Sequence, residues 1–188
     1  MEKCVIDQFN KTLLCSNSDI DAMISQLAET IIKEYNDFTD VIIVGVLSNG
    51  APIAERLAKL ISIKKDIQLP VGFLDVAVYR DDIESLGQYV TLKESNLPVD
   101  IHNMRVILVD DVIHHGRTAR AALNALFDFG RPLDVAYSVL IDRGERCLPI
   151  KPNFVGRTIS ISSSQYVAVN LLEVDGEDAI YLVSANEI

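Results

Sequence analysis

Tryptophan is absent from the sequence, and cysteine is scarce, with three widely spaced residues and no CxxC pair. So few thiols exclude a disulfide framework and a cysteine-ligated zinc site, and they are typical of reduced cysteines in a cytoplasmic protein. No apolar run approaches the roughly 18 residues that cross a bilayer. Residues 1–15 also lack the apolar core of a signal peptide. We therefore expect a soluble, cytoplasmic protein with no membrane partner.

Basic residues are also few. The chain has 17 Lys and Arg and 27 Asp and Glu, which gives a formal net charge of −10. Nucleic-acid binding takes most of its non-specific affinity from Lys and Arg that neutralise phosphates, so this balance disfavours RNA as a partner. Small phosphorylated molecules remain compatible with an acidic chain, because the backbone N–H groups of a loop bind phosphate without net positive charge.

The apolar residues that are present alternate between two periods. The chain has 188 residues, of which 49% are hydrophobic, which predicts one domain (residues 1–188) with a substantial core. Helical spacing appears at residues 19–35, with Ser18 as N-cap, and at residues 50–61 and 117–129. A continuous apolar run, typical of a strand buried on both faces, occupies residues 41–47, and residues 71–79, 105–110 and 135–142 are predicted as three further strands. Strands that alternate with helices predict an α/β fold whose central, mostly parallel sheet is flanked by helices.

Two stretches do not follow this alternation. Residues 80–104 are polar and aperiodic over a length that, in a compact domain, is typical of a lid or a flexible arm. After Asp142 the chain has short strand-like pieces around Gly156 and Gly176, at residues 154–161, 166–172 and 179–183. We expect these pieces to form a small antiparallel hood beside the parallel sheet, within about residues 143–188.

The segment that joins the third predicted strand to the following helix carries the polar residues of a candidate ligand site. In open α/β sheets, ligands bind beyond the carboxyl ends of the strands, where Asp110 and Asp111 are placed. Their carboxylates can accept hydrogen bonds from sugar hydroxyls or orient the waters of a hydrated Mg²⁺. Gly116 allows close backbone approach and Thr118 brings a hydroxyl to a helix N-terminus, which together favour phosphate. The alternative is a solvated turn with two capping acids.

Residues 105–118 resemble the ribose-phosphate motif of the type I phosphoribosyltransferases, the enzymes that use phosphoribosyl pyrophosphate. The likeness extends from about residue 41 to the C-terminus, in order and with similar spacing, and it is to the PyrR family. That family comprises bacterial pyrimidine operon regulators and uracil phosphoribosyltransferases. The segments that carry the likeness are Gly72-Phe-Leu-Asp75, Tyr79-Arg-Asp-Asp82, Gly130-Arg-Pro132, Asp142-Arg-Gly-Glu-Arg146, Leu148-Pro-Ile150 and Phe154-Val-Gly156.

The resemblance implies the type I phosphoribosyltransferase fold and the conversion of uracil and phosphoribosyl pyrophosphate to UMP and pyrophosphate. It implies that Asp110 and Asp111 contact the ribose hydroxyls and hold Mg²⁺ indirectly, through water, and that Arg80 contacts the pyrophosphate beside the arm. A homodimer or a higher homo-oligomer is also expected. Three binding groups follow from the family's motifs: a pyrophosphate loop at Ser48, Asn49 and Gly50, a 5-phosphate cradle at Val112, Ile113, His114, His115, Gly116, Arg117 and Thr118, and a cap over the base at Phe154 and Val155.

The sequence departs from the family's pattern at the phosphate sites and in the segments linked to RNA. His115 stands where the family usually has Thr, which removes a hydroxyl donor that a protonated imidazole would partly replace. Ser48-Asn49 stands where the family commonly has Thr-Arg or Thr-Lys, and losing that cation would weaken pyrophosphate binding by about 1–3 kcal/mol. Glu145 and the serines of residues 162–165 stand where RNA-binding members carry basic residues. RNA is again disfavoured.

Three functions stay open on the sequence alone. The first is an enzyme that makes UMP. The second is a purine enzyme, because Gly45-Val-Leu-Ser-Asn-Gly50 and Lys151-Pro-Asn-Phe-Val-Gly156 also resemble hypoxanthine phosphoribosyltransferases. The third is a non-catalytic protein that senses UMP or phosphoribosyl pyrophosphate, or an RNA-binding attenuator.

Overall fold

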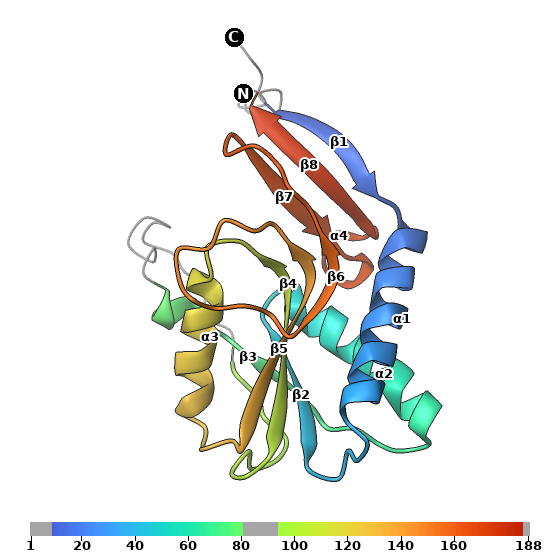
Figure 1. Cartoon of the computed structure of the whole chain (residues 1–188), viewed down its shortest axis with the longest axis vertical. Coiled ribbons are helices and arrows are strands. Elements are labelled where there is room, and N and C mark those ends of the chain that lie inside the picture. The colour runs from blue at the N-terminus through green and yellow to red at the C-terminus, as the bar shows by residue number, and fades with distance from the viewer. Residues whose placement is uncertain (1–8, 81–93, 186–188) are drawn as a thin grey trace, which may run out of the picture.

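The structure of the chain, a computed structural model, describes residues 9–80 and 94–185 (Figure 1). Its larger sheet has five strands in the order β3-β2-β4-β5-β6, and every neighbouring pair is parallel. This arrangement confirms the predicted α/β fold with a central parallel sheet. The strands are β2 (Val41–Val46), β3 (Val71–Leu74), β4 (Arg105–Ile113), β5 (Asp134–Asp142) and β6 (Phe154–Thr158).

The smaller sheet is antiparallel and joins both ends of the described chain in the order β1-β8-β7. It lies above the carboxyl ends of the larger sheet (Figure 1), and we call it the hood. The predicted antiparallel hood is therefore present, but its first strand comes from the N-terminal side, where no strand was predicted. The three strands are β1 (Phe9–Cys15), β7 (Gln165–Asn170) and β8 (Ala179–Ala185).

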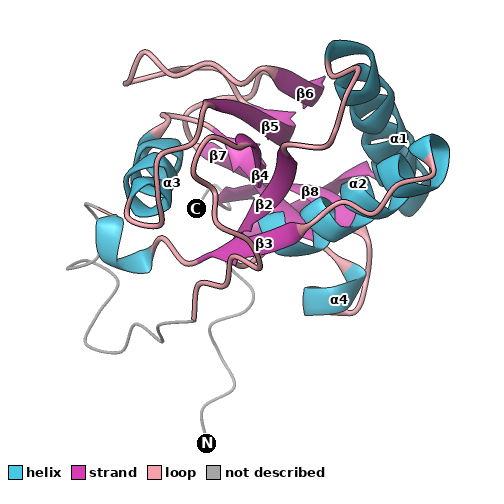
Figure 2. Ribbon diagram, turned by 90° about the horizontal axis from the view of Figure 1, so that it is seen from below, coloured by secondary structure: helices cyan, strands magenta, loops and turns pink. Residues whose placement is uncertain are grey.

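Helices cover both faces of the larger sheet (Figure 2). Helices α1 (Asn17–Glu34) and α2 (Gly50–Lys65) lie on one face, and α3 (Arg117–Phe127) lies on the other. Two single turns complete the described elements, the 3₁₀ turn η2 (Ala77–Tyr79) and α4 (Leu172–Asp175). None of the helices in the described ranges is long and apolar enough to cross a membrane.

The core has two layers because successive side chains of a strand point to opposite faces of the sheet. On β4, Ile107 and Val109 belong to the apolar cluster beneath α1 and α2. Val106 and Leu108 belong to the cluster beneath α3. All four side chains are fully buried, which explains why the strand has a continuous apolar run instead of an alternating one.

The first helix begins two residues earlier than predicted, and its N-cap is Ser16 instead of Ser18. Asp19 lies three positions after Ser16 and its carboxylate accepts the Ser16 N–H at 2.9 Å. This is half of a capping box, in which the third helical residue returns a hydrogen bond to the cap.

Two strand ends also differ from the prediction. Strand β3 stops at Leu74 instead of residue 79, because the Asp75 carboxylate accepts the Ala77 N–H at 2.9 Å and turns the chain. Strand β4 continues three residues beyond its predicted end, because its pairing with β5 extends to Ile113 opposite Asp142. The acidic residues of the candidate site are therefore inside a strand and not after it.

The predicted hood strand at residues 154–161 is wrong in its location. Phe154 pairs with Ser138 and Val155 pairs with Val139, so β6 is the edge strand of the larger, parallel sheet. The hood proper consists of residues 9–15 and 165–185.

The predicted arm at residues 80–104 is only partly tested, because residues 81–93 lie outside the described residues. Its second half belongs to the fold. Asn96 and Phe73 exchange two backbone hydrogen bonds of 2.8 Å, and Ile101 is fully buried in the core. A Cβ atom at Gly72 would lie 2.5 Å from the Cδ2 atom of Leu97, so a larger residue there would displace the Leu97 side chain.

Candidate active site

The loops that follow β2 and β4 meet under the hood, at the carboxyl ends of the parallel strands (Figure 1). The loop after β2 carries Ser48, Asn49 and Gly50, and its Leu47–Ser48 peptide bond is cis. Gly50 is buried at the first position of α2, where a Cβ atom would lie 2.4 Å from the carbonyl oxygen of Val109. Only glycine therefore allows α2 to begin directly against β4, beside the acidic pair.

Asp110 is a buried acid with two hydrogen-bond donors. Its carboxylate accepts the hydroxyl of Tyr137 at 2.9 Å and the backbone N–H of Asp111 at 3.0 Å. Burial, and then the neighbouring charge of Asp111, raise the pKa of Asp110 well above its ordinary value. Burial also raises the pKa of Tyr137. In this environment a bound cation or a hydroxyl donor would stabilise the ionised form of Asp110.

Asp111 is half-buried and accepts hydrogen bonds from the next residue of β4 and from the loop that follows β2. One carboxylate oxygen accepts the Val112 N–H at 2.7 Å, and the other accepts the side-chain amide of Asn49 at 3.1 Å. Burial raises the pKa of Asp111 as well, although these two donors act in the opposite direction. Together the two acids present oxygen atoms that can accept hydrogen bonds from the hydroxyls of a sugar.

This acidic pair suits a hydrated Mg²⁺ better than a metal caged by protein atoms. Within residues 9–80 and 94–185, no group of three or more His, Cys, Asp or Glu side chains could hold an ion. Mg²⁺ usually keeps several waters and is held by one or two carboxylates together with substrate phosphates. Asp110 and Asp111 supply two adjacent carboxylates of this kind, so the residues present fit a magnesium ion bound through water.

Asn49 connects the acidic pair to the hood. Its amide nitrogen donates to Asp111 and also to the carbonyl oxygen of Val169 in β7, at 2.9 Å. An amide nitrogen has two hydrogens, and both are used in these two contacts. The side chain that stands where the family commonly has a cation is therefore turned toward the protein and contributes no positive charge to the site.

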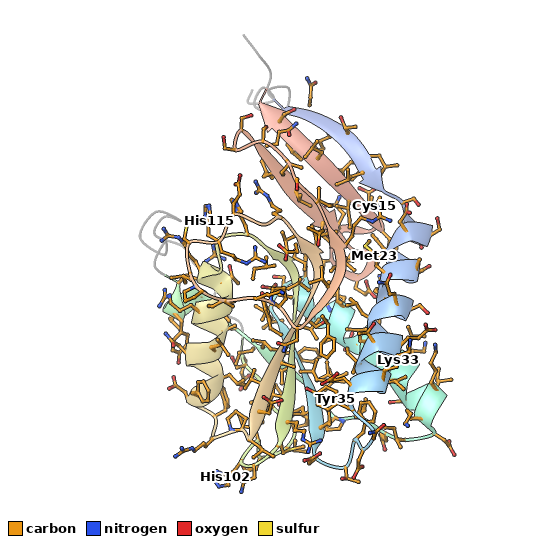
Figure 3. The ribbon with its side chains drawn as sticks, in the orientation of Figure 1. Cys15, Met23, Lys33, Tyr35, His102 and His115 are labelled. Carbon is orange, nitrogen blue, oxygen red and sulfur yellow. The ribbon has the colours of Figure 1, made fainter. Side chains whose placement is uncertain are left out.

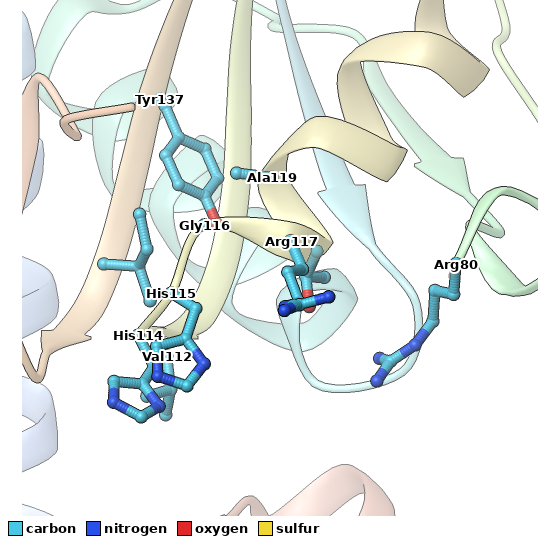
Figure 4. Close-up of a pocket in the computed structure, with 10 residues that line it drawn as sticks. Arg80, Val112, His114, His115, Gly116, Arg117, Ala119 and Tyr137 are labelled. Carbon is cyan, nitrogen blue, oxygen red and sulfur yellow. The ribbon is translucent and has the colours of Figure 1, made fainter. Parts of the chain in front are cut away.

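A cavity of about 250 Å³ lies beside the acidic pair, over the N-terminus of α3 (Figure 4). Gly116, with a φ of 89°, adopts the left-handed conformation that favours glycine and is the residue from which α3 begins. The residues that line the cavity are Arg80, Val112, Ile113, His114, His115, Gly116, Arg117, Thr118, Ala119 and Tyr137. The structure thus brings the whole predicted 5-phosphate cradle together with Arg80.

The two histidines of the cradle stack on each other, with ring centroids 3.7 Å apart and planes inclined by 26°. A nitrogen of His114 lies 3.3 Å from the carboxylate of the exposed Glu145. Burial lowers the pKa of His114, although Glu145 acts in the opposite direction. Figure 3 places His115 at the hood end of the molecule, whereas His102, which the sequence gives no role, lies at the opposite end.

Phe154 begins strand β6 of the larger sheet. Its side chain is buried in the core, where its ring centroid is 6.4 Å from that of Tyr35 at the C-terminal end of α1. Val155 is half-buried and packs against the apolar cluster beneath α3. The Phe154 side chain is therefore packed in the core from β6, and the predicted contacts of Phe154 and Val155 with the base stay predictions.

Arg80 lines the cavity and directly follows Tyr79. The Tyr79 hydroxyl donates to the carboxylate of Asp128 just beyond α3, which fixes the turn that precedes Arg80. In Figure 4, Arg80 lies on the far side of Arg117 from the histidines. Two cationic side chains, Arg80 and Arg117, thus line the cavity.

Three further residues of this region make contacts beside the cradle, and of these Tyr137 was missed in the sequence. Tyr137 was not assigned to the site, although a tyrosine in an otherwise apolar strand is a signal of a buried hydroxyl with a partner. Arg143 donates to the carbonyl oxygen of Gln165 at 2.9 Å, and Arg146 pairs with Asp142 at 2.7 Å. These two arginines are therefore engaged inside the protein, next to the cradle.

Comparison with known proteins identifies the family. Residues 16–175 match the family described as the phosphoribosyl transferase domain. The chain is 41% identical over 180 residues to the bifunctional protein PyrR of Chloroflexus aurantiacus, covering 95% of this chain and 99% of that protein. It is also 41% identical over 157 residues to the bifunctional protein PyrR of Thermus thermophilus, covering 84% and 87%. The chain belongs to the PyrR family of phosphoribosyltransferases.

Solved structures agree on the fold of this PyrR-family chain. A hypoxanthine-guanine phosphoribosyltransferase of Bacillus anthracis superimposes with a TM-score of 0.69 at 20% identity, covering 93% of this chain and 98% of that one. The hypoxanthine phosphoribosyltransferase of Trypanosoma cruzi gives the same TM-score at 17% identity, covering 93% and 97%. At such identities the likeness concerns the fold alone. The type I phosphoribosyltransferase fold expected from the sequence is confirmed.

Proposed function

We propose that this chain transfers the phosphoribosyl group of phosphoribosyl pyrophosphate to uracil, giving UMP and pyrophosphate. The observation that carries the proposal is the arrangement of Asp110 and Asp111 beside a glycine-capped cavity over the N-terminus of α3. Support for uracil comes from the relatives near 40% identity, which bear the name PyrR. The hypoxanthine enzymes match at 20% identity and lower in the two cases above and do not favour a purine.

In the proposed reaction the bond between the ribose C1 and the pyrophosphate oxygen breaks, and a bond between C1 and N1 of uracil forms. The N1 proton of uracil leaves and the bonding pair departs with the pyrophosphate. Asp110 and Asp111 accept hydrogen bonds from the ribose hydroxyls and stabilise positive charge on the sugar ring, as preorganised groups do in other polar transition states. When bound, Mg²⁺ would neutralise charge on the pyrophosphate, and the two acids would hold it through water.

The cradle holds the 5-phosphate of the substrate in this proposal. Residues 112–118 place the N-terminus of α3 at the cavity, where backbone N–H groups and the helix dipole favour an anion. Arg80 and Arg117 add positive charge. Because Asn49 is bonded to Asp111 and Val169, the pyrophosphate is held by the backbone of residues 48–50 and by Arg80.

The relatives' name describes a bifunctional protein, so we also propose a pyrimidine-responsive regulatory role for this chain. UMP, the product, is then the natural signal, because it would occupy the same cavity as the substrate. Regulation through RNA is disfavoured by the net charge of −10.

The test is product formation from phosphoribosyl pyrophosphate and Mg²⁺ with uracil, hypoxanthine or guanine offered separately. We expect UMP with uracil and no nucleotide with either purine. A purine nucleotide as the main product would reject the uracil assignment. Binding of UMP without any product would instead favour a sensor that has kept the site and lost the chemistry.

A further inference from the structure

Arg146 is a cationic side chain that is used almost entirely inside the protein. Its Nε donates to the carbonyl oxygen of Ile150 at 3.1 Å, and one terminal nitrogen donates to the carbonyl oxygens of His114 and Gly144, both at 2.8 Å. Its other terminal nitrogen lies 2.7 Å from the carboxylate of Asp142. The side chain is 20% exposed. One guanidinium thus connects the cradle to the loop that follows β5.

This loop, residues 143–150, binds three successive carbonyl groups of the cradle. The carbonyl oxygen of Ile113 accepts the Arg143 N–H at 2.9 Å. The carbonyl of His114 accepts the guanidinium of Arg146. The carbonyl of His115 accepts the N–H groups of Cys147 and Leu148, at 3.1 and 3.2 Å.

The direction of these carbonyls fixes the direction of the neighbouring N–H groups. In a planar trans peptide, the C=O of one residue and the N–H of the next point in opposite directions. Binding the carbonyls of residues 113–115 to the loop therefore turns the N–H groups of His114, His115 and Gly116 away from it. These residues line the cavity, where such donors would face an anion.

We infer that Arg146 is a positioning residue for phosphate binding: it holds the cradle so that its backbone donors face the bound phosphate. This inference rests on the proposed function of the cavity, and it assigns a role to a residue outside it. The planar guanidinium reaches three carbonyls and one carboxylate at fixed angles, which the single ammonium group of lysine cannot reproduce. It also removes Arg146 from the cations available to RNA.

The first experiment measures amide hydrogen–deuterium exchange of residues 112–118 in Arg146→Met, Arg146→Lys and the unmodified protein. We expect exchange in this segment to accelerate by about tenfold or more in Arg146→Met and by less in Arg146→Lys, on the scale of a lost charge-assisted hydrogen bond. Arg105→Met is the matched control, because Arg105 pairs with Asp40 at 3.5 Å at the opposite end of β4. Unchanged exchange at residues 112–118 in Arg146→Met would overturn the inference.

The second experiment measures the Kd for UMP and the KM values for phosphoribosyl pyrophosphate and uracil. In Arg146→Met we expect the first two to rise by about tenfold to a hundredfold, with little change in the KM for uracil. In Arg146→Ala, millimolar guanidinium should restore part of the affinity, since a free guanidinium can refill the site. The inference would be overturned if the Kd and both KM values rose equally, if Arg105→Met gave the same rise, and if guanidinium restored nothing. Arg146 would then contribute only to the general stability of the fold. If the unmodified protein bound no UMP, the proposed function would fail, and the exchange experiment would still decide the role of Arg146.

Discussion

Under the proposed function, Asp110 serves chemistry at the expense of stability. Only 5% of its surface is exposed. Its carboxylate accepts hydrogen bonds from the Tyr137 hydroxyl and from one backbone N–H. A carboxylate in such a place resists ionisation, because water no longer solvates the charge. If Asp110 had no catalytic use, an asparagine at this position would give a more stable protein.

We expect Asp110→Asn to lower turnover by about a hundredfold or more, since a neutral amide cannot stabilise positive charge on the ribose. At neutral pH the same change should raise the unfolding temperature. The pKa of Asp110 is raised in the folded state, so its contribution to stability is full below the pKa of the unfolded chain and is lost as the pH rises toward the folded value. The difference between the two proteins should therefore grow with pH.

Thermal unfolding of both proteins across a pH series checks this prediction. At about pH 3, below the ordinary pKa of aspartate, the two unfolding temperatures should nearly coincide. Tyr137→Phe is the control, because it removes a donor to Asp110 without removing the charge. Normal turnover in Asp110→Asn would show that the ribose site lies elsewhere.

The residues of the site differ in how far the sequence could predict them. Asp110, Asp111 and the cradle lie within nine consecutive residues, so a local motif is enough to place them together. Tyr137 and Arg146 contact the same site from 27 and 32 positions away, counted from Asp110 and His114. Their roles depend on the register of β5 against β4, in which Tyr137 lies opposite Leu108. No local pattern reports that register.

At the scale of elements, the hood is joined to the rest of the molecule by apolar packing of Val169 and Ile180 in the core and by a set of polar contacts. Arg56 of α2 makes a two-pronged contact with Glu173 of α4, at 2.9 and 2.6 Å. It makes a second one with Asp178, just before β8, at 3.0 and 2.8 Å. Because α2 begins at the loop of residues 48–50, this arginine connects that loop's helix to the hood.

We expect Arg56→Met to destabilise the fold by about 1–3 kcal/mol, between the values of surface and buried ion pairs, because Asp178 is only 6% exposed and would lose its counter-charge. Urea unfolding measures the loss, and hydrogen exchange in β7 and β8 shows where the opening occurs. Lys64→Met, on the same helix, breaks the exposed contact with Glu29 and should destabilise the fold less than Arg56→Met does. Equal losses in the two variants would contradict a special role for Arg56.

Asn49 makes the second connection, between the hood and Asp111. We expect Asn49→Ala to raise the KM for phosphoribosyl pyrophosphate by about tenfold, since Asp111 loses a donor and β7 loses its contact with the loop. Steady-state kinetics with uracil held at saturation measure the change. Asn49→Arg would introduce the family's cation but break both contacts, so recovery of affinity in that variant would mean that charge matters more than the two hydrogen bonds.

Elements were predicted most reliably where burial on both faces made the signal unambiguous. Strands β2, β4 and β5 have continuous apolar runs and lie in the middle of the sheet. Strand β6 has an equally apolar start, but its place at the edge of the parallel sheet depends on pairing with β5, which the run itself does not report. Strand β1 has exposed residues from Asn10 to Leu13 and gives no clear alternation.

At the scale of the whole molecule, charge governs which partners can approach. The net charge of −10 repels polyanions at long range, whereas the cavity itself is lined by two arginines, Arg80 and Arg117. The binding of a small phosphorylated ligand depends on the charges close to the cavity. The binding of RNA depends on the charge of the whole surface.

We expect RNA to bind only weakly, with an affinity that disappears between about 50 and 200 mM salt, as non-specific phosphate contacts do. Filter binding of a pyrimidine-operon leader RNA at both salt concentrations, with and without UMP, measures this. Submicromolar affinity at the higher concentration that responded to UMP would contradict the expectation and favour regulation through RNA. Chromatography of the same samples tests the predicted homo-oligomer.

The pairing of β1 with β8 has a consequence for synthesis. Phe9 lies opposite Ala185, so β1 cannot pair with β8 until nearly the whole chain has been synthesised. Contacts between residues this distant in sequence form slowly. During synthesis they form last, because β8 is among the last segments to be made. The parallel sheet and the cradle can take shape on the nascent chain, but the hood that closes over them cannot. A polypeptide truncated before β8 should therefore form the cradle but lack the complete hood that covers it.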